Sequence, residues 1–271
     1  MSWRSHALAA SGAAALGFIL LPIVFVVWLS FFAQEIPAFP PQGYALRWFG
    51  AVFEHRQFVQ GFITSLQVAV TATVIGLALG VPAALMLSRR EGGAGGPLGQ
   101  LLLLPLVVPG IVLGTAIYIF HVEAEILAYE RGHTLAVIGS LGGLITAHVL
   151  IVIPWTMRLV LASLAGLDRS VEEAALNLGA TPWVTFRLIT LPMIRPGIVA
   201  AALFGFVTSF GNLEMSLFLV GPGRTTLPIA ILQYLEWKLD PTIAAVSVYQ
   251  MIIIAAALLV TDRFVRLVRV V

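Results

Sequence analysis

A polar stretch interrupts the long apolar runs of this sequence: EEAALNLGATPWVTFRLITLP, from Glu172 to Pro192. It contains two adjacent carboxylates, an asparagine, a glycine, a Thr-Pro pair and an arginine. The segments on both sides are long and almost entirely apolar. The role of such a stretch depends on the class of protein that contains it. The composition of the chain indicates that class.

Composition places the chain in a membrane. Hydrophobic residues make up 59% of the 271 residues and charged residues 10%, whereas soluble domains are about 45–50% apolar and about 25% charged. The net charge of +2 is small and the arginines are scattered, so no basic cluster predicts nucleic-acid binding. Cysteine is absent and the five histidines are scattered, so no metal site is expected. His148, inside an apolar segment, is expected to serve a helix–helix hydrogen bond.

Six apolar segments are long enough to cross a hydrocarbon core of about 30 Å as helices. The alternating segments of a membrane barrel are missing from the sequence, so the predicted fold class is all-α integral membrane, with one transmembrane domain over residues 1–271. The first segment is about twice the length of a signal-peptide core, and we interpret it as a retained helix. The predicted spans are residues 7–32, 62–87, 98–120, 135–157, 194–220 and 243–260.

The distribution of arginine and lysine predicts the orientation. With the N-terminus inside, ten cations fall in inside segments and five in outside loops, which together account for the 15 in the chain. Both termini and the loop of residues 166–192 are therefore predicted to lie in the cytoplasm. The inside cations are Arg4, Arg89, Arg90, Arg158, Arg169, Arg187, Arg195, Arg263, Arg266 and Arg269; the outside ones are Arg47, Arg56, Arg131, Arg224 and Lys238.

The polar stretch has the pattern of two short helices joined at a glycine corner. Ser170 and Glu173 have the S-x-x-E spacing of a capping box, which predicts the start of the first helix. Gly179 suits the left-handed position after that helix, and Thr181-Pro182 suits the start of the second. Leu191-Pro192 is then predicted to turn the chain back into the membrane. On this local pattern alone, the stretch is equally consistent with a docking surface and with a plain connecting loop.

The first of these two helices is predicted to be amphipathic. Its apolar positions recur at i, i+3, i+4 and i+7, which places them on one face. They are Val171, Ala174, Ala175 and Leu178. The carboxylates Glu172 and Glu173 and the amide Asn177 lie off this stripe.

One carboxylate falls inside a predicted span, that of Glu214 in FGFVTSFGNLEMSLFLVGPG. At mid-bilayer a carboxylate costs about 2.5–3.5 kcal/mol on insertion scales, so it should face protein or water. It can line a translocation path, pair with another subunit or lie in water near the outer end of the span. Ser209, Asn212 and Ser216 stack on one side of a helix, away from Glu214 unless the helix is distorted at Gly211. These polar residues, with Glu214, are the candidates for a solute path.

The polar stretch resembles the signature of permease subunits of binding-protein-dependent ABC importers, E-A-A-x3-G-x9-I-x-L-P. All seven fixed positions are present: Glu173, Ala174, Ala175, Gly179, Ile189, Leu191 and Pro192. The stretches LPLVVPGIVLGTAI, GPGRTTLP and DPTIAAVS are similar to the spermidine/putrescine-type branch, and the resemblance runs from about Thr64 to the C-terminus. Polyamine permeases of this branch tend to read S-F-D-D where this chain reads Ser209-Phe210-Gly211-Asn212, which puts a multiply charged cation in doubt.

The resemblance implies a permease fold of six helices whose cytoplasmic loop, residues 166–192, couples to an ATP-hydrolysing subunit. The residues implied at that contact are Glu172, Glu173, Ala174, Ala175, Gly179 and Ala180. The implied partners are a second, homologous or identical permease, a dimer of ATP-binding subunits that hold ATP and magnesium, and a periplasmic solute-binding protein.

The chain itself has no site for ATP. A Walker loop needs a lysine after its second glycine, and the single lysine here lies in EWKLD. Together with this, the resemblance implies a transport subunit of a bacterial-type inner membrane and not an enzyme. The implied cargo is a small organic solute that is polyamine-like or otherwise carries an amine. An ATP-independent secondary transporter and a membrane scaffold subunit are the alternatives.

Chemical labelling tests the predicted orientation. The chain has no cysteine, so Gln42→Cys and Asn177→Cys each create a single reactive site. An impermeant thiol reagent added to intact cells is expected to label position 42 and to leave position 177 unlabelled until the cells are opened. Labelling of position 177 but not of position 42 in intact cells would reverse the topology.

Overall fold

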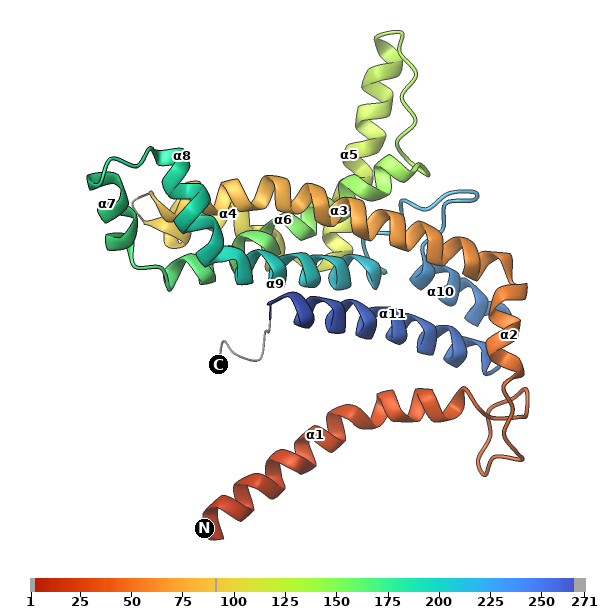
Figure 1. Ribbon diagram of the computed structural model, residues 1–271. Coiled ribbons are helices and arrows are strands. Elements are labelled where there is room, and N and C mark those ends of the chain that lie inside the picture. The colour runs from red at the N-terminus through yellow and green to blue at the C-terminus, as the bar shows by residue number, and fades with distance from the viewer. Residues whose placement is uncertain (1–2, 91, 266–271) are drawn as a thin grey trace. The chain divides into compact units, whose positions relative to one another are not determined.

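The computed structural model describes residues 3–90 and 92–265, and these are folded almost entirely into helices (Figure 1). Within these ranges the extended pairings are isolated bridges, so the all-α prediction is confirmed. Arg266 and Arg269, which were counted among the inside cations, lie outside the described residues. The helices are α1 (Trp3–Leu29), α2 (Arg47–Glu54), α3 (Arg56–Ser88), η1 (Gly93–Gly95), α4 (Pro97–Leu103), η2 (Leu104–Leu106), α5 (Gly110–Glu130), α6 (Leu141–Ala165), α7 (Arg169–Asn177), α8 (Pro182–Thr185), η3 (Phe186–Thr190), α9 (Leu191–Phe210), α10 (Leu227–Trp237) and α11 (Thr242–Val265).

Six helical segments in the described part of the chain are long and apolar enough to cross a membrane, one for each predicted span. The boundaries agree within three residues for the first and last spans. The second helix starts six residues earlier than predicted, and the others differ more. The segments are Leu8–Leu29, Arg56–Ser88, Gly110–Glu130, Leu141–Ala165, Pro182–Phe210 and Thr242–Arg263.

The third predicted span, residues 98–120, is wrong as a single helix. Helix α4 and the 3-10 turn η2 end at Leu106, and α5 begins at Gly110 directly after Pro109 and continues to Glu130. Proline lacks the backbone donor that a helix interior needs, so it interrupts the ladder here and precedes a new helix. Glu125, predicted in an outer loop, is helical, and its carboxylate accepts from the backbone N of Val137 (2.6 Å) and of Ile138 (2.8 Å).

The fourth span starts later than predicted because the loop before it is held by these hydrogen bonds. Helix α6 begins at Leu141, where the Oγ of Ser140 accepts from the backbone N of Gly143 at 3.0 Å. It then runs to Ala165 rather than ending near residue 157. The polar loop that follows α6 is correspondingly shorter.

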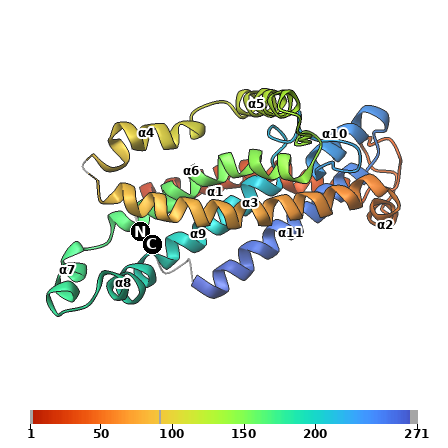
Figure 2. The same ribbon diagram turned by 90° about the horizontal axis from the view of Figure 1, so that it is seen from above.

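The described chain divides into two compact units, and residues 60–229 with 256–271 form the larger one. In it, α3, α6 and α9 lie side by side, as both Figure 1 and Figure 2 show. Small residues allow this close packing: a Cβ on Gly80 of α3 would come within 2.8 Å of Thr156 on α6, and one on Gly197 of α9 within 2.5 Å of Ser163. The bundle core consists of Ala84, Leu87, Met157, Val160, Ile194 and Ala201.

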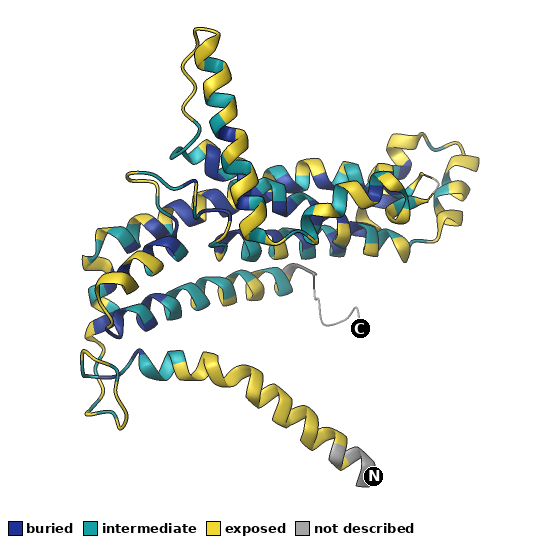
Figure 3. Ribbon diagram, turned by 180° about the vertical axis from the view of Figure 1, so that it is seen from behind, coloured by how far each residue is buried: buried dark blue, intermediate teal, exposed yellow. Residues whose placement is uncertain are grey.

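The smaller unit comprises residues 1–59 and 230–255. Most of α1 is exposed along its length, as Figure 3 shows, which suits contact with lipid. Trp48 of α2 is buried and donates from Nε1 to the carbonyl of Phe32 at 2.6 Å. The ring of Tyr249 on α11 packs edge-on against Phe49 and Phe53.

A buried carboxylate in this unit joins the end of α10 to the start of α11. Asp240 accepts from the hydroxyl of Tyr234 (3.0 Å), the backbone N of Thr242 (2.9 Å) and the Nζ of Lys238 (2.9 Å). Burial by itself raises the pKa of Asp240, but the hydrogen bonds from Thr242 and Lys238 outweigh it and hold that pKa below its ordinary value. The hydrogen bond to Asp240 likewise raises the pKa of Lys238.

Replacing this carboxylate is expected to destabilise the smaller unit. Asp240→Asn should lower the free energy of unfolding by about 1–3 kcal/mol at neutral pH, because charged hydrogen bonds are lost around a buried group. A carboxylate with a lowered folded-state pKa stabilises the fold above its unfolded-state pKa, and this contribution disappears as the pH falls through the folded-state pKa. Thermal unfolding in detergent should therefore show a difference between wild type and variant that shrinks on acidification. The exposed Glu236→Gln is the matched control, and an Asp240→Asn variant as stable as this control at pH 7 would contradict the assignment.

Candidate functional site

The first candidate site is the loop of α7 and α8, which lies at one end of the α3–α6–α9 bundle (Figure 1). Helix α7 begins at Arg169, and its N-cap is Asp168, whose Oδ1 accepts from the backbone N of Ser170 at 2.9 Å. This hydrogen bond lowers the pKa of Asp168. The predicted capping box of Ser170 and Glu173 is therefore wrong. Aspartate caps a helix as well as serine does and adds a negative charge at the positive end of the helix dipole.

The glycine corner after α7 is confirmed. Gly179 has φ +90°, and its N–H and that of Ala180 donate to the carbonyls of Leu176 and Ala175, each at 3.0 Å. These two bonds form a Schellman motif, which satisfies the last carbonyls of the helix. The second helix starts as predicted, with the Oγ1 of Thr181 accepting from the backbone N of Val184 at 3.4 Å.

The predicted turn at Leu191-Pro192 is wrong. Helix α8 passes into the π-helical turn η3 and then into α9, so that one helical segment extends from Pro182 to Phe210. A π-helical turn accommodates a local disruption of the α-helical hydrogen bonds, and here it lies directly before Pro192. The loop of α7 and α8 is thus continuous with the fifth membrane helix.

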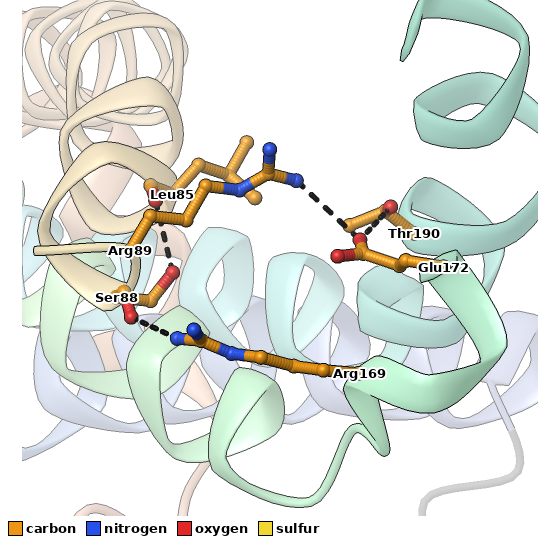
Figure 4. A network of polar contacts seen from close by, with 6 residues as sticks. All are labelled: Leu85, Ser88, Arg89, Arg169, Glu172 and Thr190. Atoms are coloured by element: carbon orange, nitrogen blue, oxygen red, sulfur yellow. Dashed lines mark hydrogen bonds and ion pairs between the residues drawn. The ribbon is translucent and has the colours of Figure 1, made fainter. Parts of the chain in front are cut away.

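Polar contacts fasten α7 to the neighbouring helices (Figure 4). The carboxylate Oε1 of Glu172 accepts from the hydroxyl of Thr190 and lies 3.4 Å from a guanidinium nitrogen of Arg89. The guanidinium of Arg169 donates to the backbone carbonyl of Ser88. Glu172 was predicted at the contact with a partner, but its side chain points to the bundle and is only 17% exposed.

The opposite face of α7 is exposed. Glu173 and Ala174 are open to solvent, and Ala175 and Ala180 are half-buried. Gly179 is also exposed. The predicted apolar stripe lies largely on this outer side, since Val171 is exposed and Leu178 is 89% exposed. All six predicted contact residues are therefore at least partly exposed, but the carboxylate of Glu172 differs from the others in bonding to the bundle.

The second candidate site is the predicted solute path after α9. That helix ends at Phe210, with Gly211 as its C-cap, and residues 212–219 form successive turns, so the fifth span does not extend to residue 220 as predicted. Asn212 starts these turns because its Oδ1 accepts from the backbone N of Met215 at 2.8 Å. The predicted helical face of Ser209, Asn212 and Ser216 is therefore wrong as a helix.

His148 of α6 nevertheless brings these residues together. Its Nδ1 lies 2.8 Å from the Oγ of Ser209 and its Nε2 lies 3.1 Å from the Oγ of Ser216, and all three side chains are buried. The Oγ of Ser216 also lies 3.3 Å from the carbonyl of Asn212. The helix–helix hydrogen bond expected of His148 is confirmed. The imidazole holds the segment that unwinds after α9.

Glu214 lies apart from this group. It is exposed, and its carboxylate lies against Gly110, where a Cβ would collide with it. The backbone carbonyl of Glu214 packs on Gly114, where a Cβ would come within 2.5 Å. Gly110 is the first residue of α5, directly after the break in the predicted third span. The contact of Glu214 with Gly110 therefore connects this break with the non-helical stretch that follows α9. Sequence reasoning missed this contact, for which the glycines spaced by four in GIVLG are the available signal.

Comparison with known proteins identifies the family to which the chain is similar. Residues 76–270 match the model of the binding-protein-dependent transport system inner membrane component. The putrescine transport system permease protein PotI of Escherichia coli K12 is 32% identical over 233 residues, covering 85% of this chain and 80% of PotI. The molybdenum transport system permease protein ModB of Mycobacterium bovis is 32% identical over 206 residues, covering 73% and 75%.

A solved structure shares the fold. A bacterial alginate ABC transporter, determined in complex with a periplasmic protein bound to an alginate pentasaccharide, matches with a TM-score of 0.77 at 15% identity. The match covers 97% of this chain and 94% of that chain. The chain belongs to the family of binding-protein-dependent transport system inner membrane components, and it is a permease subunit of an ABC importer of the polyamine-type branch.

Proposed function

We propose that this permease moves a small, amine-bearing organic solute, polyamine-like or similar, from a periplasmic binding protein into the cytoplasm. It would pair with a second permease, identical or homologous, and with a dimer of subunits that bind ATP and magnesium and carry out the hydrolysis. The chain would lie in the bacterial inner membrane with both termini in the cytoplasm. Because the family is one of ABC importer permeases, the secondary transporter and the scaffold subunit are set aside.

The exposed face of α7 is the observation that carries the coupling role. Val171, Ala174 and Leu178 present apolar surface to solvent, and the exposed carboxylate Glu173 lies beside them. Exposed apolar patches rimmed by polar groups are typical of interaction sites. The Asp168 cap and the Gly179 corner hold α7 in a defined shape at both ends, so the surface is preorganised for a partner.

The continuity of α8, η3 and α9 supports transmission into the membrane. A displacement applied at the loop reaches α9 through an uninterrupted helical segment, Pro182–Phe210. The far end of that segment is the unwound stretch that contains Ser216 and Glu214. In an alternating-access cycle, closure of the ATPase dimer would shift this stretch against α5.

Glu214 supports the preference for an amine-bearing solute. Its carboxylate is exposed at the junction of two interrupted spans, and the described contacts leave its charge without an ion-pair partner. An ammonium group would form a charge-assisted hydrogen bond there. Discontinuous membrane helices are a frequent setting for transporter sites.

Two substitutions at the outer face of α7 test the docking role. Glu173→Lys reverses a charge there, and Gly179→Val places a β-branched residue at φ +90°, which disturbs the corner. Each should weaken co-purification with the ATPase subunit and lower solute-stimulated ATPase activity about fivefold or more, the effect of losing an interface contact worth over 1 kcal/mol. Glu130→Lys and Gly132→Val, the latter at another left-handed glycine, are the matched controls. Wild-type association and stimulation in both test variants would refute the docking role.

Neutralising Glu214 tests the solute path. Glu214→Gln should reduce uptake of radiolabelled putrescine about tenfold or more, in line with the loss of a charged hydrogen bond, while the importer complex stays assembled on a sizing column. Glu123→Gln, on an exposed position of α5, is the control. Dissociation of the complex would instead assign Glu214 to pairing between subunits, and uptake at the wild-type level would remove it from the path.

A further inference from the structure

Two adjacent carboxylates on α7 face opposite directions. Glu173 is exposed on the outer side, whereas the side chain of Glu172 is 17% exposed and turns to the bundle. Successive helical residues are about 100° apart, so neighbours on a helix belong to different faces. The two carboxylates therefore have different roles.

One oxygen of Glu172 connects three structural elements. Its Oε1 accepts from the hydroxyl of Thr190 in η3 and lies 3.4 Å from the guanidinium of Arg89, which follows the end of α3 (Figure 4). Glu172 itself belongs to α7. From the loop between α6 and α9, the same carboxylate thus contacts the end of α3 and the turn that leads into α9.

The contact with Thr190 is the more enclosed of the two. Thr190 is buried, at 1% exposure, so its hydroxyl needs a partner within the protein, and Glu172 supplies it. Thr190 is the last residue of the π-helical turn and directly precedes Leu191, where α9 begins. A π-helical turn inside a helix frequently marks a functional position.

Arg169 makes a second attachment beside the first. It donates to the backbone carbonyl of Ser88, the last residue of α3. The last carbonyls of a helix have no partner within it, and a cation there is also favoured by the helix dipole. Arg169 and Glu172 are three residues apart and so lie on one side of α7. This inner side is fixed to the bundle while the outer side stays open.

We infer that Glu172 is a positioning residue, which makes α7 move as one body with the ends of α3 and α9. The inference rests on the proposed docking role of α7 and deepens it. Without the carboxylate, α7 is joined to α9 by the chain through the Gly179 corner and to α3 by Arg169 alone. The helix would still bind the ATPase subunit through its outer side, but its displacement would reach the membrane helices less completely. Because Arg89 is 60% exposed, its ion pair adds little to stability, so the effect appears in coupling and not in folding.

Binding and coupling measured on the same complex separate this role from docking. Glu172→Gln and Thr190→Val are made in the importer reconstituted in nanodiscs with its ATPase and binding proteins. Both variants should co-purify with the ATPase subunit in the wild-type ratio. Solute transported per ATP hydrolysed should fall about two- to thirtyfold, the range for residues that modulate coupling without touching either ligand. Glu173→Gln is the matched control, and it should weaken association instead.

A distance measurement tests the attachment directly. Spin labels on Leu178→Cys and Arg90→Cys report the separation of α7 from the end of α3, and the chain has no other cysteine. The distance distribution should be narrow in the otherwise wild-type protein and broad with Glu172→Gln or Thr190→Val. An unchanged distribution together with unchanged coupling would overturn the inference, as would loss of ATPase binding by Glu172→Gln, which would return Glu172 to the docking surface. Failure of the docking role itself would appear differently, as wild-type ATPase binding by Glu173→Lys and Gly179→Val.

Discussion

Hydrocarbon offers no hydrogen-bond partner to a peptide group, and this constraint determines where the chain is helical and where it is not. The six long apolar helices satisfy their backbones internally. Where a helix stops, side chains take over: Glu125 accepts from Val137 and Ile138, Asn212 from Met215, and Ser65 from Leu227. Irregular backbone in this protein is therefore tied to particular polar residues, and those residues lie next to the candidate path and the loops.

The same requirement gives the two candidate sites different characters. Around α9 and α6 the polar groups are buried and mutually satisfied, as His148 is with Ser209 and Ser216. Around α7 the polar groups are divided between an inner side that bonds to the bundle and an outer side that is open. The buried network fixes the segment that follows α9, whereas α7 is held to the bundle on one side and stays open on the other.

The sequence predicts the number of spans, the all-α class and the glycine corner, because apolar length and a left-handed glycine depend on local chemistry. It does not locate the interruptions. Pro109 precedes a new helix, whereas Pro82, Pro154 and Pro196 are accommodated inside helices and Pro192 lies in the first turn of α9. A proline therefore does not by itself mark an interruption. The start of α7 was misplaced for a similar reason, since Asp168 and Ser170 are both good caps and tertiary contacts decide between them.

The candidate residues divide in the same way. The outer residues of α7 could be assigned from the resemblance of their motif, and their exposure is compatible with that assignment. Glu172 could not be separated from Glu173 on sequence, because both follow the start of an amphipathic helix and only the contacts with Arg89 and Thr190 distinguish them. Gly110 and Gly114 signal that another segment approaches α5 closely, but the sequence does not identify Glu214 as the residue that does so.

The π-helical turn at Phe186–Thr190 also determines how the faces of α8 are rotated relative to those of α9. A π turn contains about one residue more than an α turn, so the faces of α8 and α9 are offset by about 100° relative to an unbroken helix. Removing one residue there would return the segment to regular α-helical winding and would rotate α8, with the corner before it, about the axis of α9. The one extra residue in the π-helical turn thus determines the direction in which the loop of α7 and α8 faces. The length of the segment between Thr181 and Pro192 is therefore as constrained as its composition.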